Sequence, residues 1–217
     1  MAFLNLDPPS LKICGVTTAG DATALADLGV DALGANFWPH SKRFLDPARA
    51  GFLKDLAGRI VRVGVFVNAP TDLPVSLFKD GLIDLVQLHG DEPESDIPLI
   101  RKHGIPVIRA LAVDESGALP DVAEFAADAV LLDAHAPGIY GGTGRTIDWT
   151  VAGAFVKEHP DLPVILAGGI TPANAAEALE AVRPAAIDIA SGAESAPGIK
   201  DFDKVSALLE AVRHGRM

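Results

Sequence analysis

The chain has 217 residues, of which 49% are hydrophobic and 22% are charged, and its formal net charge is −11. This composition supports a sizeable hydrophobic core and argues against a disordered chain. The acidic excess, without any run of lysine or arginine, argues against a nucleic-acid partner, because such binding depends on clustered basic side chains.

The only cysteine of the chain excludes an intrachain disulfide and fits a reducing, cytoplasmic location. Residues 1–10 lack the charged segment and the apolar run of a signal peptide. No stretch reaches the roughly 18 apolar residues of a membrane span, so we expect no membrane partner. Barrels built from β and α units often run to about 200–250 residues as one domain. We therefore expect a single domain over residues 1–217, with residues 1–10 as a short N-terminal extension.

Short apolar segments typical of buried strands recur along the chain, separated by stretches with helical spacing. The predicted strands are Leu11–Gly15, Ala32–Phe37, Arg62–Val67, Leu85–His89, Val107–Leu111, Ala129–Asp133, Val164–Ala167 and Ile187–Ser191. The predicted helical stretches are Ala22–Gly29, Pro47–Leu56, Leu73–Lys79, Ile97–Lys102, Val122–Ala127, Val151–Lys157, Pro172–Val182 and Phe202–Val212. The threonines at 17 and 18, Thr171 with Pro172, and Asp201 are predicted to begin helices, and Gly29 is predicted to end one.

Strict alternation of strands and helices implies parallel strands, and eight such units predict an α/β fold, a (β/α)₈ TIM barrel. A doubly wound open sheet is the alternative. That fold is expected to carry a G-x-G-x-x-G turn after the first strand, and Cys14-Gly15-Val16-Thr17 lacks this spacing. In a barrel the chemistry lies at the carboxyl ends of the strands, which directs attention to the polar residues there.

The seventh and eighth predicted strands both end in glycine-bearing turns, at Gly168 and Gly169 and at Ser191 and Gly192. Glycine lets backbone N–H groups approach a phosphate closely, and barrels commonly bind phosphate after these two strands. We therefore expect a phosphorylated small molecule to bind here. Backbone donors also explain how an acidic protein holds an anion without a lysine cluster.

Cys14 and Asp133 stand at the ends of the first and sixth predicted strands. A lone cysteine is either a small buried hydrophobe or a reactive thiolate, and its position alone leaves both readings open. Asp133 closes an apolar strand, where desolvation favours the protonated acid. A thiolate base and a carboxylic acid across the barrel opening suit a proton-transfer reaction.

Several other polar side chains are candidates for the same face. Arg43, in the second loop, is able to fork onto a carboxylate, and aromatic residues near it offer a surface for a flat ring. Gln87 and His89 share one face of the fourth strand and are possible pocket-lining residues. Lys12 is expected to pair with Asp188, another possible pocket residue, as a structural contact inside the barrel. No Cys/His cluster has zinc-like spacing, so no metal is expected.

Taken together, these segments resemble phosphoribosylanthranilate isomerase, a family of the tryptophan pathway, along nearly the whole chain. Each matching segment is weak alone, but their order along the chain makes the resemblance specific. The segments are Lys12-Ile13-Cys14-Gly15, Val63-Gly64-Val65-Phe66-Val67-Asn68, Gln87-Leu88-His89-Gly90-Asp91-Glu92, Leu132-Asp133-Ala134, Gly141-Gly142-Thr143-Gly144, Leu166-Ala167-Gly168-Gly169 and Ser191-Gly192-Ala193-Glu194-Ser195-Ala196-Pro197-Gly198.

The resemblance implies a cofactor-free Amadori rearrangement of N-(5′-phosphoribosyl)anthranilate to the 1-deoxyribulose phosphate. By the same match, Cys14 is the general base at C2, and Asp133 is the general acid that opens the ribose ring. Arg43 corresponds to the arginine that meets the anthranilate carboxylate. The glycine turns correspond to the phosphate site.

Three sites depart from the family pattern. Ala35-Asn36 replaces a bulkier apolar pair, Ala190 stands where a second serine is common, and Arg145 stands where lysine is frequent. The first two place the floor of the anthranilate site and one phosphate contact in question. None of the three removes a residue with a proposed catalytic role.

Other functions remain as alternatives to the isomerase. Indole-glycerol-phosphate synthase is expected to carry a lysine acid and an extra N-terminal helical segment, and a histidine-pathway sugar isomerase is expected to have aspartate in place of Cys14. A non-catalytic barrel that binds a phosphorylated metabolite has no need for the pair Cys14 and Asp133. The oligomeric state, monomer or homodimer, is left open by the sequence.

Overall fold

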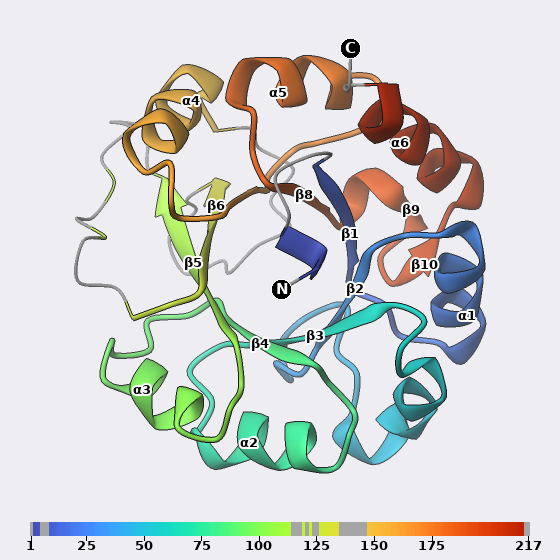
Figure 1. Cartoon of the computed structure of the whole chain (residues 1–217). Helices are drawn as coiled ribbons and strands as arrows, with labels where there is room; N and C mark the ends of the chain where they lie inside the picture. Colours follow the sequence, from blue (N-terminus) through green and yellow to red (C-terminus); the bar gives the residue numbers. More distant parts are fainter. Residues whose placement is uncertain are drawn as a thin grey trace.

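The computed structural model describes residues 2–4, 9–113, 119, 122, 126–134 and 147–214. Within these residues, eight parallel strands pair in chain order, and the last pairs with the first to close a barrel. Figure 1 looks along this barrel and shows the helices arranged in a ring around it. The (β/α)₈ barrel predicted from the alternating pattern is confirmed. The strands are β1 (Ser10–Cys14), β2 (Ala32–Asn36), β3 (Val61–Phe66), β4 (Leu85–Leu88), β5 (Val107–Val113), β6 (Ala129–Ala134), β7 (Val164–Leu166) and β8 (Ala186–Ile189).

The helices pack outside the strands. In the described part of the chain they are α1 (Ala19–Leu28), α2 (Asp72–Lys79), α3 (Asp96–Arg101), α4 (Trp149–Glu158), α5 (Ala175–Val182) and α6 (Phe202–His214), with 3₁₀ helices η1 (Ala2–Leu4), η2 (Pro47–Leu56) and η3 (Ser191–Ala193). Two short antiparallel strands, β9 (Glu194–Ala196) and β10 (Ile199–Lys200), form a hairpin after β8 that the sequence did not predict.

Three ends of two helices follow the predicted signals. The side chain of Thr18 accepts a hydrogen bond from the Asp21 N–H at the start of α1, and Gly29 ends that helix with φ of 79°. Asp201 accepts hydrogen bonds from the N–H groups of Asp203 and Lys204 at the start of α6. These local signals act through backbone groups that any helix end leaves unpaired, so they can be recognised in the sequence.

The segment Pro47–Leu56 is a 3₁₀ helix, where the sequence predicts a helix without specifying its type. Its buried residues are Ala50, Leu53 and Leu56. This spacing of three residues matches the three-residue turn of a 3₁₀ helix and brings all three side chains to the core side.

The prediction that Thr171 and Pro172 begin a helix is wrong, because α5 begins at Ala175. The side chain of Asn174 accepts a hydrogen bond from the Thr171 N–H at 2.7 Å, which stabilises a separate turn before the helix. The predicted eighth strand also ends earlier, at Ile189, since Ser191 already begins η3. Half of the predicted helical stretch Val122–Ala127, residues 123–125, lies outside the described residues.

Apolar side chains fill the interior of the barrel. Phe3 and Leu4 of η1 pack into this interior cluster and are only 3% and 5% exposed. Figure 1 shows this N-terminal turn over the centre of the barrel. The sequence prediction treats residues 1–10 as an extension, whereas Ser10 already belongs to β1 and pairs with Ala186 of β8.

Aspartates that precede β2, β4 and β6 fix the amino ends of β1, β3 and β5. In each case a carboxylate oxygen accepts a hydrogen bond from a backbone N–H of the preceding strand. The pairs are Asp31 with the N–H of Leu11 (2.8 Å), Asp84 with that of Arg62 (2.8 Å) and Asp128 with that of Val107 (2.9 Å). This repeated contact places the stabilising charges at the amino ends of the strands, away from the carboxyl ends where barrel chemistry takes place.

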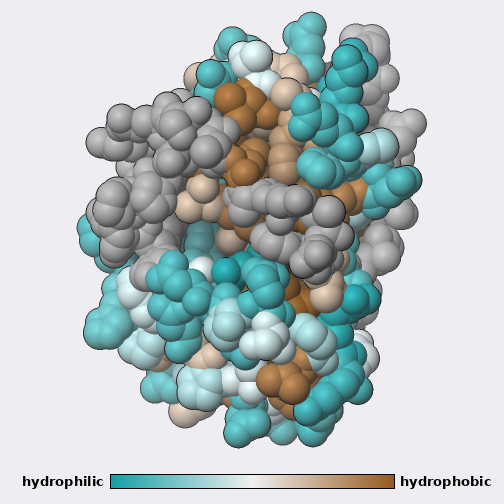
Figure 2. Space-filling view, turned by 90° about the vertical axis from the view of Figure 1, so that its left-hand side faces the viewer, coloured by the Kyte–Doolittle hydropathy of each residue, from teal (hydrophilic) through white to brown (hydrophobic). Residues whose placement is uncertain are grey.

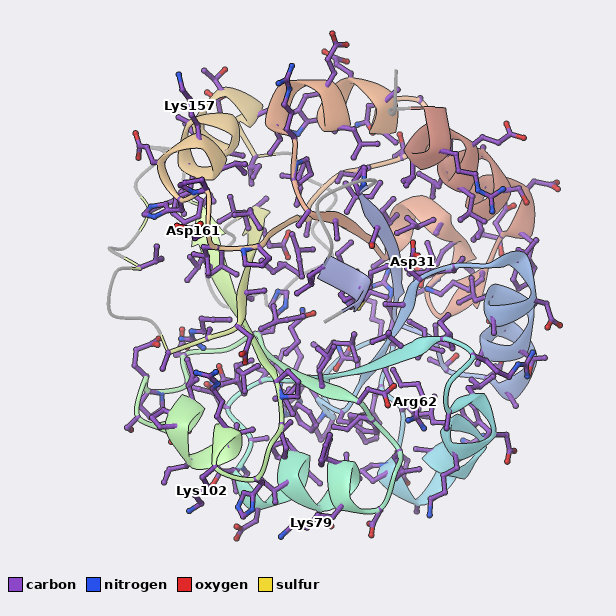
Figure 3. All side chains as sticks on the ribbon, viewed as in Figure 1. Asp31, Arg62, Lys79, Lys102, Lys157 and Asp161 are labelled. Carbon is purple, nitrogen blue, oxygen red and sulfur yellow. The ribbon has the colours of Figure 1, made fainter. Side chains whose placement is uncertain are left out.

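The outer surface is largely hydrophilic on the side shown in Figure 2, with apolar residues gathered toward the middle of that face. Figure 3 shows Lys79, Lys102 and Lys157 on the outer side of the helical ring, pointing away from the barrel. None of the described helices has the length and apolar character required to cross a membrane.

We predict that Asp84→Ala destabilises the fold by about 1–3 kcal/mol, because it leaves the buried Arg62 side chain and its N–H without their carboxylate. The measurement is the free energy of unfolding in urea. Asp27→Ala is the matched control, since it breaks an exposed pair with Arg59 and should cost less than about 1 kcal/mol. Equal effects of the two substitutions would contradict the role given to Asp84.

Candidate active site

Cys14 is the last residue of β1, at the carboxyl end of the barrel, and it is partly buried. The backbone N–H groups of Gly15 and Val16 both donate to the Gly34 carbonyl of β2, which fixes the chain just after the thiol. Gly15 has φ of 76°, and a Cβ there would lie 2.2 Å from Cδ of Arg43. Glycine after Cys14 therefore allows both the turn and the close approach of the arginine side chain.

Buried charges surround the thiol. Burial raises the pKa of Cys14 above its ordinary value, whereas the ammonium groups of Lys12 and Lys200 act to lower it. The predicted pair is confirmed, with Nζ of Lys12 at 2.7 Å from Oδ2 of Asp188. Burial alone would lower the pKa of Lys12, but Asp188 and Cys14 raise it above its ordinary value, so the ammonium stays protonated.

Asp133 lies in β6, and Figure 1 shows β6 across the barrel from β1. The carboxyl group is buried, and its Oδ1 accepts a hydrogen bond from the Ala134 N–H at 2.8 Å. Its Oδ2 lies 3.3 Å from Nε2 of His89. The acid candidate is thus held on one oxygen by the backbone and contacted on the other by an imidazole.

Gln87 and His89, predicted to share a face of the fourth strand, contact each other through Nε2 of Gln87 and Nδ1 of His89 at 2.8 Å. With the amide nitrogen donating, Nδ1 is the acceptor and the imidazole proton lies on Nε2, facing Asp133. The result is a chain of contacts from Gln87 through His89 to Asp133, reaching from β4 to β6 past β5. Oε1 of Gln87 is buried and has no hydrogen-bond partner among the described residues.

The two predicted glycine turns lie against each other at the ends of β7 and β8. Gly168 and Gly169 have φ of 84° and 63°, which favour glycine. A Cβ at Gly192 would lie 1.9 Å from the Ile170 carbonyl oxygen, so only glycine allows this contact between the turns. Within the described residues, the backbone N–H groups of Gly168, Gly169, Ser191 and Gly192 have no acceptor. Unpaired donors converging from two turns are the arrangement that binds an anion.

Arg43 meets a protein carboxylate that the sequence analysis did not identify as its partner. Nε and Nη2 of Arg43 donate to Glu194 at 2.9 Å and 2.6 Å, in a bidentate pair. Glu194 also accepts from the Lys200 ammonium at 2.7 Å and from the Gly198 N–H. Burial alone would raise the pKa of Glu194, but the hydrogen bonds from Arg43 and Lys200 hold it below its ordinary value.

Lys200 connects this cluster to the thiol. Its ammonium donates to the Cys14 carbonyl oxygen as well as to Glu194. Burial lowers the pKa of Lys200, and the Glu194 carboxylate only partly opposes that effect. The hairpin β9–β10 therefore joins the ends of β1 and β8 to the loop after β2. Glu194 stands in a segment that the sequence analysis matched to the family, whereas no signal in the sequence singled out Lys200.

Comparison with known proteins agrees with this geometry. The family model for N-(5′-phosphoribosyl)anthranilate (PRA) isomerase matches residues 11–211. The chain belongs to this family. It is 42% identical over 204 residues to the N-(5′-phosphoribosyl)anthranilate isomerase of Geobacter metallireducens, covering 94% of this chain and 98% of that protein. The isomerase fold and the enzyme class are therefore established for this chain.

Solved structures of the family are similar over the same length. The phosphoribosyl anthranilate isomerase of Thermus thermophilus has a TM-score of 0.84 and 36% identity, covering 94% of this chain and 98% of its own. A second isomerase structure contains reduced 1-(o-carboxyphenylamino)-1-deoxyribulose 5-phosphate. It has a TM-score of 0.78 and 31% identity, and the match covers 95% of this chain and 99% of that one.

Other residues named in the sequence analysis have the following surroundings. Phe37, one of the aromatics expected near a flat ring, is buried and stacks on Phe66 with ring centroids 5.4 Å apart. Asn36, a departure from the family pattern, accepts a hydrogen bond from the Trp38 N–H and so shapes the second loop. The segment Gly141–Gly144 and Arg145 lie outside the described residues.

We predict that Gly34→Ala lowers the kcat/KM of the isomerase by at least about tenfold. A Cβ at Gly34 would lie 2.7 Å from Sγ of Cys14 and 3.1 Å from its Cα, so the thiol must move, and misplaced catalytic groups lose rate steeply. Steady-state kinetics measure the effect. Gly20→Ala in α1 is the control, because nothing lies within 4 Å of its added Cβ. Full activity of Gly34→Ala would contradict the assigned position of the thiol.

Proposed function

We propose that this isomerase carries out the Amadori rearrangement of N-(5′-phosphoribosyl)anthranilate to 1-(2-carboxyphenylamino)-1-deoxyribulose 5-phosphate in tryptophan biosynthesis. The observation that carries the proposal is the match of the family over residues 11–211, which includes the thiol of β1 and the carboxyl group of β6. Their positions on opposite sides of the barrel suit an acid and a base that act on one substrate between them.

In this mechanism Asp133 is the general acid. It gives a proton to the furanose ring oxygen as the C1–O bond breaks, and the anthranilate nitrogen lone pair forms a C=N bond to C1. Because the carboxyl group is buried and held by the Ala134 N–H, it is fixed for this transfer. His89 has its Nε2 at 3.3 Å from the carboxyl group, where its N–H is placed to hydrogen-bond the carboxylate that remains after the transfer.

Cys14 is the general base of the second half. The thiolate removes the proton from C2, the electron pair forms a C1=C2 bond, and the iminium nitrogen becomes an amine. The enol at C2 then loses its hydroxyl proton and takes the keto form as C1 gains a proton, so the product is an isomer of the substrate, with C1 reduced and C2 oxidised. Because the balance closes without an external oxidant or reductant, the proposal includes no cofactor.

Binding is assigned to two ends of the site. The phosphate is proposed to accept hydrogen bonds from the turns at Gly168, Gly169, Ser191 and Gly192, whose backbone donors have no acceptor among the described residues. Arg43 is proposed to meet the anthranilate carboxylate. Its bidentate pair with Glu194 uses Nε and Nη2, so the contact to substrate falls to Nη1.

For the whole protein, we propose one barrel domain over residues 1–217 and a cytoplasmic location, supported by the biosynthetic role of the family. The functional unit is a monomer or a homodimer. Gln87 and Asp188 are proposed to line the pocket; Oδ1 of Asp188 is buried without a partner among the described residues.

The experiment that tests the function is turnover of freshly made N-(5′-phosphoribosyl)anthranilate, followed by the loss of its anthranilate fluorescence. We expect turnover by the folded protein and a product of unchanged mass. No turnover of this substrate, together with release of carbon dioxide and an indole product from the 1-deoxyribulose phosphate, would indicate the synthase alternative. Binding without turnover would indicate a non-catalytic barrel, and either result overturns the proposal.

We predict that Cys14→Ser lowers kcat by about 10²–10⁴-fold with little change in KM, because an alcohol is a poor base near neutral pH. Steady-state kinetics with the same substrate give both constants. Ser206→Ala in α6 is a control on the outer helix, where the hydroxyl donates to the Phe202 carbonyl of the same helix. Unchanged kcat in Cys14→Ser would mean that the thiol is only a packing group.

We predict that Arg43→Ala raises KM by roughly ten- to a hundredfold, the loss expected for a hydrogen bond between charged groups. The value of kcat should change less, since Arg43 neither gives nor takes the transferred protons, and Lys12 and Lys200 still face the thiol. Arg59→Ala removes an exposed arginine of similar size and is the control. An unchanged KM in Arg43→Ala would exclude the carboxylate contact.

A further inference from the structure

Lys12 is a fully buried cation for which the proposed proton transfers have no use. Its side chain is 0% exposed and is the largest of the completely buried side chains in the described residues. Lys12 and Cys14 stand two residues apart in β1, so their side chains share the inner face of the strand. Burying an ammonium group is costly unless it is paired and hydrogen-bonded.

The Lys12 ammonium and the Cys14 sulfur both lie beside Gly34 of β2. A Cβ built on Gly34 would lie 2.7 Å from Sγ of Cys14 and 3.0 Å from Nζ of Lys12. The sulfur and the ammonium therefore adjoin the same small space, which stays open because residue 34 has no side chain. Asp188 holds the ammonium there from β8 at 2.7 Å.

We propose that Lys12 is a positioning residue for the isomerisation: its ammonium, fixed by Asp188, stabilises the thiolate of Cys14. This inference rests on the proposed function of Cys14 as the general base. Burial works against the charged form of a thiol, and a cation held close to the sulfur offsets that effect. The pair with Asp188 thus has a role beyond the structural contact expected from the sequence.

Other charged groups also face the thiol. Lys200 of β10 acts on Cys14 in the same direction as Lys12, and the Arg43 guanidinium from the second loop interacts with it as well. Asp188 acts in the opposite direction. Of these groups, Lys12 has the strongest effect on the pKa of the thiol after burial, which makes it the residue to test.

The test uses the fact that Cys14 is the only cysteine of the chain, so alkylation by iodoacetamide reports on this thiol alone. The alkylation rate is measured against pH by intact mass, without substrate. Lys12→Met should move the midpoint of this profile upward by about 1–3 pH units. The pH at which kcat reaches half its plateau should rise in the same direction. Lys79→Met, which removes an outward-pointing lysine of α2, should move neither.

Lys12→Met leaves Asp188 buried and unpaired, which can prevent this variant from folding, so a second variant is needed. The double variant Lys12→Met/Asp188→Asn removes both charges, and its midpoint should lie between those of the wild type and Lys12→Met, because Lys12 acts on the thiol more strongly than Asp188 does. Unshifted midpoints in folded variants, with normal wild-type turnover, overturn the role of Lys12 and leave the proposed function intact. Absence of wild-type turnover overturns the proposed function and, with it, this role in the isomerisation.

Discussion

The pairing of β1 with β8 is the constraint on which the site depends. The register runs from Ser10 opposite Ala186 to Ile13 opposite Ile189, and it places Lys12 directly opposite Asp188. A slip of one residue would turn Asp188 to the other face of its strand and leave Lys12 buried without an anion. Since an unpaired buried charge costs several kcal/mol, the ion pair specifies the register at the seam where the barrel closes. The same register sets Cys14 beside the turn after β8.

Above this seam, a second buried ion pair organises the loops. Glu194 is almost fully buried and joins Arg43 of the second loop to Lys200 of the hairpin, while Lys200 also bonds the Cys14 carbonyl. Two segments far apart in the sequence, the second loop and the hairpin, therefore meet at one carboxylate, and Lys200 links them to the end of β1. Because two donors of Arg43 are fixed by it, the guanidinium has one orientation before any substrate arrives. The hairpin β9–β10, although short, is thus part of the site.

The contacts that could be predicted from the sequence depend on the two-residue alternation of side chains along a strand and on the closure of the barrel. Alternation along strands placed Lys12 with Cys14 and Gln87 with His89 on common faces, and closure of a barrel brought Asp188 to Lys12. Loop contacts have no such period. The pair of Arg43 with Glu194 joins residues 151 positions apart, and nothing in either loop indicates its partner. The contact between Ile170 and Gly192 could not be predicted from the sequence either, since it depends on how the two turns are placed in space.

The local charge around the thiol differs in sign from the net charge of the chain. The chain has a net charge of −11, yet the proposed substrate carries a carboxylate and a phosphate. Beside Cys14 the described residues place three cations, Lys12, Arg43 and Lys200, against two carboxylates, Asp188 and Glu194. The cluster therefore has one positive charge in excess, which a thiolate would balance. Burial disfavours a net charge, so this excess offsets part of the cost of a buried thiolate, while the pKa of Cys14 still lies above its ordinary value.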